Sequence, residues 1–218
     1  MMEPSTRENS ELVESLVTAP PLLHVWHTGP SPGGMEGAVG YRLVRIIRAR
    51  PPSETFDVLE TGAGLTTLLF LALGATKITS VDPTEGLRDR VLDEADRRQL
   101  DTNHLEYLEE RSEIALPKLF TDGRQYDVCL IDGSHAWPTV FVDFCYANAC
   151  LREGGVMLID DVQLHSVRQL FLLLAGQPEY RLISEQWDWK VGAFVKETPE
   201  PFLPYVQPFI VASTGGLV

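Results

Sequence analysis

Five acidic side chains occupy positions at which β-strands are predicted to end, and they are the residues best suited to chemistry. They are Glu60, Asp82, Asp132 and the adjacent pair Asp160 and Asp161. In a doubly wound α/β sheet, ligands bind beside the carboxyl ends of the strands. We therefore expect these acids to gather at one edge of a sheet, where a nucleotide-like cofactor and a divalent cation could lie side by side.

A short glycine turn follows the first of these acids. The run Glu60-Thr61-Gly62-Ala63-Gly64 leads from an apolar strand into a helix, and glycines let a ligand approach the backbone at a helix N-terminus. The dinucleotide fingerprint G-x-G-x-x-G is incomplete, because Thr67 occupies its third glycine position. An ordinary strand-to-helix turn is the plainer interpretation. Asp82 supports the interpretation of the turn as a cofactor site, because it ends the next strand and is suited to accept hydrogen bonds from two ribose hydroxyls.

Asp132, Asp160 and Asp161 form a pattern typical of a metal site. Each follows an apolar strand, and like charges brought close together are unfavourable unless a cation neutralises them or one binds a proton. An all-oxygen set suits Mg²⁺, Mn²⁺ or Ca²⁺ rather than zinc. Helix capping is the alternative for any single one of these acids.

Two further residues could serve the same edge. His135 follows Asp132 by three positions and could accept a proton near neutral pH, although a surface or core histidine would look the same. Ser112 begins a predicted helix and could contact an adenine, or it could be a simple N-cap. The remaining histidines, His24, His27, His104 and His165, are weaker candidates.

Alternating strands and helices must position these residues. A parallel sheet is expected from strands that alternate with helices in βαβ units, here followed by an antiparallel hairpin near Asp188. The predicted strands are Phe56–Thr61, Lys77–Asp82, Leu105–Leu108, Tyr126–Asp132 and Gly155–Asp160, with the hairpin strands Tyr180–Trp187 and Lys190–Lys196. The predicted helices are Ala38–Arg50, Leu65–Leu73, Glu85–Leu100, Ser112–Phe120 (short or kinked at Pro117), Thr139–Leu151 and Val162–Leu174.

The fold class that follows is α/β: a Rossmann-like doubly wound sheet, mostly parallel, of seven strands with an antiparallel C-terminal hairpin and helices on both faces. We divide the chain into residues 1–50, a leader, a Gly- and Pro-rich loop (19–37) and a helix that form a cap or lid; residues 51–197, the cofactor-binding domain; and residues 198–218, a Pro-rich tail. A short helix is expected at Glu11–Val17. The apolar stretch Phe202–Val211 favours a homodimer.

Composition narrows the class of partner. The chain of 218 residues has 18 Lys and Arg against 31 Asp and Glu, a formal charge of −13, so neither nucleic acid nor an anionic membrane is an expected partner. The three cysteines, Cys129, Cys145 and Cys150, lack CxxC spacing, which indicates buried reduced thiols and a cytoplasmic protein. Residues 1–15 lack the apolar core of a signal peptide, and no apolar run reaches membrane-spanning length.

Four runs of the sequence, VLETGAG, SVDP, YDVCLIDGSH and LREGGVMLIDDV, resemble class I S-adenosylmethionine-dependent methyltransferases. More narrowly, they resemble the metal-dependent O-methyltransferases of the macrocin and catechol types, over residues 58–195. The E-x-G-x-G turn is widespread in that superfamily, whereas the DGSH run and the acid pair 28 positions after Asp132 are more specific. Asp161 stands where the catechol branch has Asn, which favours the macrocin-like branch.

The resemblance assigns roles to residues. It implies that Glu60, Gly62, Ala63 and Gly64 hold the methionine part of S-adenosylmethionine, that Asp82 holds the ribose and that Ser112 lies by the adenine. It implies a divalent cation, Mg²⁺ in preference to Mn²⁺ or Ca²⁺, on Asp132, Asp160 and Asp161, with Asp132 also touching the cofactor. His135 falls at the position of the general base. The loop of residues 28–35 falls loosely where the catechol branch has a segment that covers cofactor and substrate.

The function implied is O-methylation of a small-molecule hydroxyl, on a sugar, a polyketide or a phenol. Three alternatives stay open on the sequence. A nicotinamide-dependent oxidoreductase shares the sheet and the ribose acid, although Thr67 and the acid triad speak against it. The others are a non-catalytic S-adenosylmethionine-binding protein and a methyltransferase that uses no metal.

Overall fold

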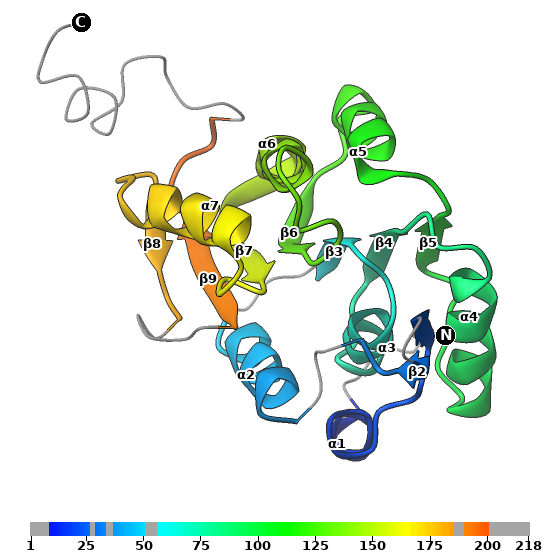
Figure 1. Ribbon diagram of the computed structural model, residues 1–218. Coiled ribbons are helices and arrows are strands. Elements are labelled where there is room, and N and C mark those ends of the chain that lie inside the picture. Colours follow the sequence, from blue (N-terminus) through cyan, green and yellow to red (C-terminus); the bar gives the residue numbers. More distant parts are fainter. Residues whose placement is uncertain (1–8, 27–28, 34–36, 51–55, 185–189, 201–218) are drawn as a thin grey trace, which may run out of the picture.

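A computed structural model describes residues 9–26, 29–33, 37–50, 56–184 and 190–200. Its centre is a seven-stranded sheet with the order β5-β4-β3-β6-β7-β9-β8, and a separate two-stranded sheet pairs β1 with β2 (Figure 1). Strands β5, β4, β3, β6 and β7 are parallel, and β9 is antiparallel to both β7 and β8. The predicted fold class, a mostly parallel doubly wound sheet with an antiparallel C-terminal hairpin, is confirmed.

The strands of the main sheet lie close to their predicted positions. They are β3 (Asp57–Thr61), β4 (Lys77–Val81), β5 (Leu105–Leu108), β6 (Tyr126–Ile131), β7 (Leu151–Asp160), β8 (Tyr180–Leu182) and β9 (Val191–Lys196). Strand β8 ends earlier than predicted, and the predicted turn near Asp188 lies outside the described residues.

Helices cover both faces of the sheet (Figure 1). One apolar core joins a face of the sheet to α1, α2, α3 and α4, and the other joins the opposite face to α5, α6 and α7. The bounds are α1 (Ser10–Thr18), α2 (Gly37–Arg48), α3 (Leu65–Ala72), α4 (Leu87–Arg97), α5 (Ser112–Thr121), α6 (Thr139–Cys150) and α7 (His165–Ala175). Because α1 and α2 share a core with the sheet, they are structural parts of the domain as well as the predicted cap. The division into three segments stays a prediction.

Strand β6 shows why the sheet strands are apolar almost throughout. Val128 and Leu130 belong to the core under α2 and α3, whereas Cys129 and Ile131 belong to the core under α6 and α7. Successive side chains of a strand point to opposite faces, so a strand with helices on both sides needs apolar residues at nearly every position. The first polar side chain after such a strand therefore marks where it leaves the core, and in β6 that side chain is Asp132.

Three local expectations were wrong. The stretch 19–37 is not wholly a loop, because β1 (His24–Trp26) pairs antiparallel with β2 (Gly29–Ser31). Strand β7 begins at Leu151 rather than Gly155, with a register shift that lets the strand pass through the two glycines. Helix α7 begins at His165 rather than Val162, because Asp161 takes a left-handed conformation (φ 56°) and starts a turn.

The structure also tests the predictions about Pro117 and about the cysteines. Helix α5 runs through Pro117 for 10 residues, so it is neither shorter than predicted nor ended by the proline. The cysteines are unpaired; Cys129 and Cys150 are buried as expected, and Cys145 is half-buried. Burial raises the pKa of the Cys150 thiol to about 11, which keeps it protonated at neutral pH. The cytoplasmic location stays a prediction.

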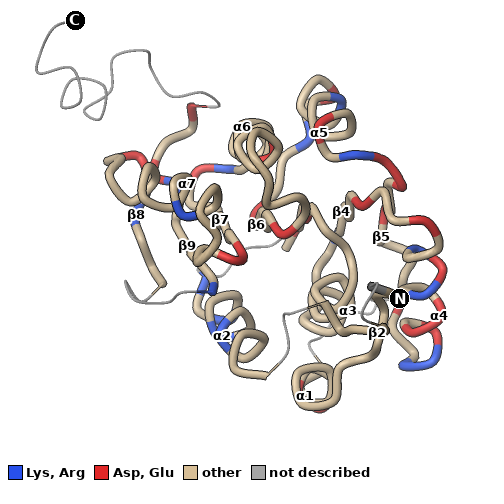
Figure 2. Tube along the Cα trace, viewed as in Figure 1, with Lys and Arg blue, Asp and Glu red and all other residues tan. Residues whose placement is uncertain are grey.

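Charge is distributed as the sequence suggested, with mixed charges along α4 and acids at strand ends (Figure 2). Among the residues that the structure describes, no helix has the length and apolar character needed to cross a membrane. The leader up to residue 8, part of the 28–35 loop and the tail from 201 onward, including Phe202–Val211, lie outside the described residues.

Candidate active site at the carboxyl edge of the sheet

The strand ends bring the predicted acids to one edge. Thr61 at the end of β3 stands opposite Val81 of β4 and Ile131 of β6, and Ile131 stands opposite Ile159 of β7. The residues that follow, Gly62, Asp82, Asp132 and Asp160, therefore emerge at the same edge. This is the edge at which open α/β sheets bind ligands.

A cavity of about 720 Å³ opens at this edge. Most of the predicted site residues line it: Gly62, Ala63, Asp82, Ser112, Asp132, His135 and Asp161. Glu60, Gly64 and Asp160 are not in its wall, although each adjoins a residue that is. The cavity also has walls that the sequence analysis did not assign, from Thr84, Arg111, Glu113 and Thr139, and it is lined by the weaker candidate His24 and by Gly33 of the 28–35 loop.

Glu60 precedes the glycine turn and is not part of the cavity wall. Its side chain is fully buried and accepts hydrogen bonds from Thr66 Oγ1 (2.6 Å), Ser80 Oγ (2.6 Å) and Thr67 Oγ1. Thr67 Oγ1 in turn accepts from the Gly64 backbone N–H. Burial raises the pKa of Glu60 to about 7, against the opposing effect of the three hydroxyls. Glu60 therefore holds the turn in shape, and its contact with the cofactor stays a prediction.

Gly62 is required by a close approach of two backbones. Its φ is +82°, and a Cβ there would lie 2.2 Å from the carbonyl oxygen of Asp132. Any other residue would both strain this left-handed backbone and separate the glycine turn from the loop after β6. The glycine turn and the acid cluster are thereby held together.

Gly64 and Gly33 make room for one imidazole ring. A Cβ on Gly64 would lie 2.7 Å from His24 Nε2, and a Cβ on Gly33 would lie 2.8 Å from His24 Cδ2. His24 belongs to β1, so the small sheet rests on the glycine turn and closes one side of the cavity. Arg90 of α4 fixes it there, because its Nε donates to the Leu23 carbonyl at 2.6 Å. Burial lowers the pKa of His24, against the opposing charge of Asp82.

Asp82 is fixed by backbone donors. Its Oδ2 accepts from the Ala63 N–H (3.1 Å) and its Oδ1 from the Thr84 N–H (2.7 Å), and the side chain is buried in the cavity wall. Each carboxylate oxygen has two lone pairs, so each can accept one further hydrogen bond. Asp82 can therefore receive two hydroxyls of a ligand.

Ser112 is the first residue of α5, and the N-cap position belongs to Arg111, so the plain interpretation of Ser112 as an N-cap is wrong. The Ser112 side chain is buried and lines the cavity. Arg111 is turned to Glu113, with which it forms an ion pair at the rim.

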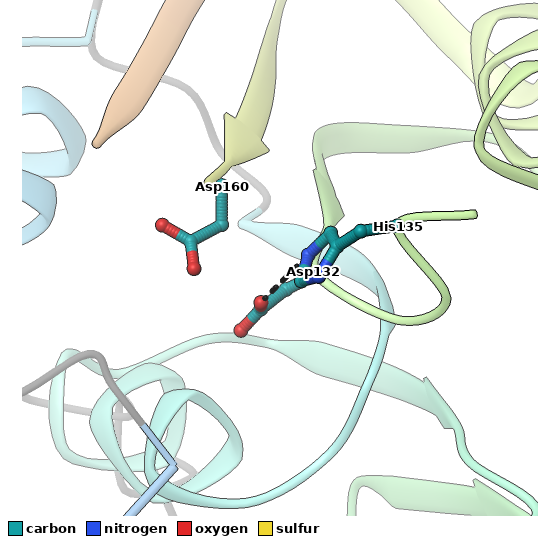
Figure 3. Close-up of side chains that lie close together, drawn as sticks. All are labelled: Asp132, His135 and Asp160. Atoms are coloured by element: carbon teal, nitrogen blue, oxygen red, sulfur yellow. Dashed lines mark ion pairs between the residues drawn. The ribbon is translucent and has the colours of Figure 1, made fainter. Parts of the chain in front are cut away.

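Buried Asp160, partly buried Asp132 and a histidine form the cluster most able to hold a cation. Oxygens of Asp132 and Asp160 and a nitrogen of His135 lie within 4.8 Å of one another (Figure 3). Asp160 stands at the end of β7, and Asp132 and His135 come from the loop after β6. His135 Nε2 lies 3.6 Å from Asp132 Oδ1, and neither His135 Nε2 nor Asp160 Oδ1 has a hydrogen-bond partner in the described chain.

The two acids resist ionisation together. Burial raises the pKa of Asp132 to about 8, helped by the charges of Asp161, Glu60 and Asp82. Burial, followed by the charges of Asp132 and Asp161, raises the pKa of Asp160 to about 9. A positive ion between them would remove this penalty, so the donor set fits a divalent cation.

Asp161 differs from the other two acids of the predicted triad. Its Oδ1 accepts from Gln163 Nε2 (2.7 Å) and Lys190 Nζ (3.0 Å), and its Oδ2 lies 3.6 Å from His135 Nδ1. These partners, against the effect of burial, hold the pKa of Asp161 below its usual value. The closest set of three is therefore Asp132, Asp160 and His135, and Asp161 faces His135 from the far side.

The remaining histidines are spread over the molecule. His165 is exposed at the start of α7, His104 lies in the turn before β5 and His27 is outside the described residues. His24 is the one the sequence argument undervalued. The sequence feature that could have pointed to His24 is the glycine at positions 33 and 64. Both glycines contact its ring, and that contact depends on tertiary structure.

Comparison with known proteins agrees with this geometry. Residues 59–162 match the family model described as a methyltransferase domain. No curated protein matches the chain. A protein from Corynebacterium glutamicum has a similar structure (TM-score 0.60, 15% identity, covering 78% of this chain and 84% of that one).

Two further solved structures resemble the chain. One is a candidate caffeoyl-CoA O-methyltransferase from Staphylococcus aureus (TM-score 0.55, 15% identity, covering 71% of this chain and 79% of that one). The other is an O-methyltransferase from Bacillus cereus in complex with S-adenosylhomocysteine (TM-score 0.53, 16% identity, covering 72% and 87%). These likenesses establish the fold.

The family match covers the glycine turn, Asp82, Ser112 and all three acids of the predicted metal triad, and it favours a methyltransferase over the other classes that the sequence left open. A nicotinamide-dependent oxidoreductase is the weaker alternative. Residues 59–162 are therefore similar to a methyltransferase domain.

Proposed function

We propose that the protein transfers a methyl group from S-adenosylmethionine to a hydroxyl of a small molecule, and that a divalent cation assists the transfer. The observation that carries the proposal is one cavity lined both by the glycine turn with Asp82 and by the Asp132 and His135 loop. Its volume, about 720 Å³, falls in the range of small-molecule sites, roughly 300 to 1,000 Å³.

The cofactor lies along the strand ends in this proposal. Ser112, at the start of α5, would receive the adenine, and Asp82, after β4, would receive the ribose hydroxyls with its two remaining acceptor sites. The backbone of Gly62 and Ala63, at the entry to α3, receives the methionine part. Asp132 and His135, in the loop after β6, would then border the part of the cavity that receives the methyl group.

The cation is assigned to Asp132 and Asp160, with His135 or Asp161 as a third donor. A bound divalent cation would lower the pKa of an acceptor hydroxyl, as it does for bound water. Two observations support the fit: the raised pKa values of the two acids, and an Asp160 oxygen without a partner among the described residues.

His135 is assigned the removal of the hydroxyl proton. Asp161 lies 3.6 Å from its Nδ1 and would stabilise the protonated ring. Ser166 of α7 donates a hydrogen bond to the His135 carbonyl and so steadies the loop that carries the ring. General-base catalysis of this kind contributes roughly 10²- to 10⁴-fold in rate.

The protein also positions the cofactor and the acceptor relative to each other. Binding cofactor and acceptor in one cavity, in line for attack, could lower the barrier by about 7–11 kcal/mol. The small β1–β2 sheet, through His24, closes a side of the cavity and helps to exclude water. No nucleic acid, membrane or protein partner is needed for this chemistry.

The test is methyl transfer to a panel of catechols, sugars and polyketide alcohols, with Mg²⁺ and with a chelator. We expect O-methylated product with Mg²⁺ and at least about a tenfold loss with chelator. Equal turnover in both would favour the metal-independent alternative. Cofactor binding without turnover on any acceptor would favour a non-catalytic protein.

His135→Ala separates the two roles open to that residue. A fall in rate with unchanged Mg²⁺ affinity identifies the base, whereas weakened Mg²⁺ affinity identifies a ligand. Unchanged rate and unchanged Mg²⁺ affinity would contradict both.

A further inference from the structure

The turn after β7 brings Asp161 to the Nδ1 side of the His135 ring. Asp161 has a φ of 56°, a left-handed conformation that is uncommon for a residue other than glycine. The Leu164 N–H donates to the Asp161 carbonyl at 2.8 Å and closes the turn, and the Val162 N–H donates to the Lys190 carbonyl at 3.2 Å. Lys190 comes directly before β9, so its main chain as well as its side chain contacts this turn.

The two carboxylate oxygens of Asp161 face different groups. Oδ1 accepts from Gln163 Nε2 at 2.7 Å and from Lys190 Nζ at 3.0 Å, whereas Oδ2 lies 3.6 Å from His135 Nδ1. An oxygen of a carboxylate has two lone pairs, so both lone pairs of Oδ1 are used. The distance from Oδ2 to the ring is longer than a hydrogen bond, but such contacts commonly shorten when an active site binds its ligands.

The two nitrogens of His135 have different surroundings. Nε2 lies 3.6 Å from Asp132 Oδ1 and has no hydrogen-bond partner among the described residues (Figure 3). Because the proposed function assigns Asp132 to the cation, Asp161 is the carboxylate that remains for the ring. A neutral imidazole carries one proton, and its hydrogen-bond partner determines which nitrogen holds that proton. A proton on Nδ1, facing Asp161, leaves the Nε2 lone pair to accept the proton of a hydroxyl.

We propose that Lys190, with Gln163 as a second donor, is a positioning residue for the His135 base: it holds Asp161 against Nδ1 and away from the cation. The inference rests on the proposed function, in which His135 removes the hydroxyl proton. It also decides a point left open there, because Asp161 is then the partner of the ring instead of the third donor to the cation.

Nitrogen NMR of the full chain with saturating Mg²⁺ tests the tautomer directly. Two-bond correlations between ring protons and labelled ring nitrogens show which nitrogen carries the proton, and His135→Ala identifies the His135 signals. An isolated histidine side chain prefers the proton on Nε2, whereas we expect it on Nδ1 in the wild-type protein. The Nε2 form should appear in Lys190→Met and predominate when Gln163→Ala is added. Lys190→Arg keeps the charge and should keep the Nδ1 form.

Mg²⁺ affinity, measured by calorimetry, tests whether Asp161 is a ligand of the cation. In a His135→Ala background Asp161 has no ring to position. Removing the ion pair there, by Asp161→Ala together with Lys190→Met, leaves the net charge unchanged and should alter Mg²⁺ affinity by less than about tenfold. A fall of about tenfold or more would show that Asp161 binds the cation and would overturn the inference.

Turnover distinguishes positioning from a purely structural role. On an acceptor that the wild-type protein methylates, Lys190→Met should lower kcat by about 10- to 100-fold, the range typical of groups that orient a catalytic residue or ligand. The KM for the acceptor should stay within about threefold, because Lys190 does not line the cavity. Lys190→Arg should recover most of kcat, and an equal loss in both variants would contradict a role for the charge.

Lys118→Met is the matched control. Lys118 Nζ pairs with Glu110 Oε1 at 2.7 Å on the exposed side of α5, and neither residue lines the cavity. The substitution removes the same side chain and the same charge from an ion pair outside the site. It should leave the His135 tautomer, the Mg²⁺ affinity and kcat unchanged.

The outcomes separate this inference from the proposed function. A proton on His135 Nε2 in the wild-type protein with Mg²⁺ bound would overturn the inference and leave the proposed function intact. So would an unchanged Nδ1 form in the folded variant that combines Lys190→Met with Gln163→Ala. Failure of the wild-type protein to bind S-adenosylmethionine would contradict the proposed function, and with it the role inferred for Lys190.

Discussion

At the scale of single residues, the site is defined by acids whose negative charge is not neutralised by neighbouring groups of the protein. Asp132 and Asp160 lie close together, with pKa values raised to about 8 and about 9, and Asp160 Oδ1 has no hydrogen-bond partner among the described residues. Asp82 and Asp161, by contrast, each accept two hydrogen bonds from the chain. The contrast separates the acids that would hold a cation from those that shape its surroundings.

Asp160→Asn tests the cation site. The amide keeps the shape of the side chain but cannot neutralise a cation, so Mg²⁺ affinity measured by calorimetry should fall by at least about 100-fold, since even indirect partners of a metal contribute about 10- to 100-fold. Affinity for S-adenosylhomocysteine should change by less than about threefold, because Asp160 does not line the cavity. Asp93→Asn, on the exposed side of α4, removes the same charge as a control. Unchanged Mg²⁺ affinity in Asp160→Asn would contradict the assignment.

Glu60 predicts a pH dependence of stability. Its pKa is about 7 when folded, against 4.5 as a free side chain, so the native state binds the proton more tightly. Its contribution is therefore fully present below about pH 4.5 and is lost as the pH rises through 7, by about 3 kcal/mol in total.

Glu60→Gln removes this titration. Its melting temperature should vary less than that of the wild-type protein between pH 5 and 8. As the pH rises, the melting temperature of the variant should therefore increase relative to that of the wild-type protein. Parallel curves over that range would show that Glu60 does not titrate there.

At the scale of elements, the small β1–β2 sheet is the part of the site that lies outside the matched domain. His24 fits against Gly64 of the glycine turn, and Arg90 of α4 ties Leu23 to the same place. A segment distant in sequence thus closes the cavity over the glycine turn. The fit depends on glycine at position 64, where φ is +148°.

A double-mutant cycle tests this contact. Gly64→Ala should weaken S-adenosylhomocysteine binding by about tenfold or more, because the new Cβ meets the His24 ring and displaces the small sheet. In a His24→Ala background the same change should matter less, since only backbone strain remains. Gly123→Ala, with φ +69° and open space around its Cβ, controls for strain alone. Additive effects of Gly64→Ala and His24→Ala on binding would contradict the proposed contact.

The sequence predicted the elements of the main sheet well, because their signals are local. Apolar runs such as Val128–Ile131 have helices on both faces, and each ends in a polar residue at the site. The sequence did not predict features that depend on contacts between residues far apart in the chain. The pairing of β1 with β2, the role of Glu60 beneath the turn and the place of His24 all depend on which residues meet after folding. The hydrophobic periodicity of the sequence does not predict those contacts.

At the scale of the whole molecule, two helices and a small sheet precede the segment that is similar to a methyltransferase domain, residues 59–162. Helices α1 and α2 complete a core with the sheet, and the small sheet completes the cavity. The formal charge of −13 and the acids at the carboxyl edge fit a site for a cationic cofactor and a metal ion better than one for nucleic acid. The acceptor, the oligomeric state and the cytoplasmic location remain predictions.

The central claim is that the cavity binds S-adenosylmethionine, and calorimetric titration of the full chain tests it most directly. We expect saturable binding of S-adenosylmethionine, with or without Mg²⁺, and none of NAD in the same buffer. Binding of NAD, or the absence of S-adenosylmethionine binding even with Mg²⁺ and the acceptor panel present, would contradict the account.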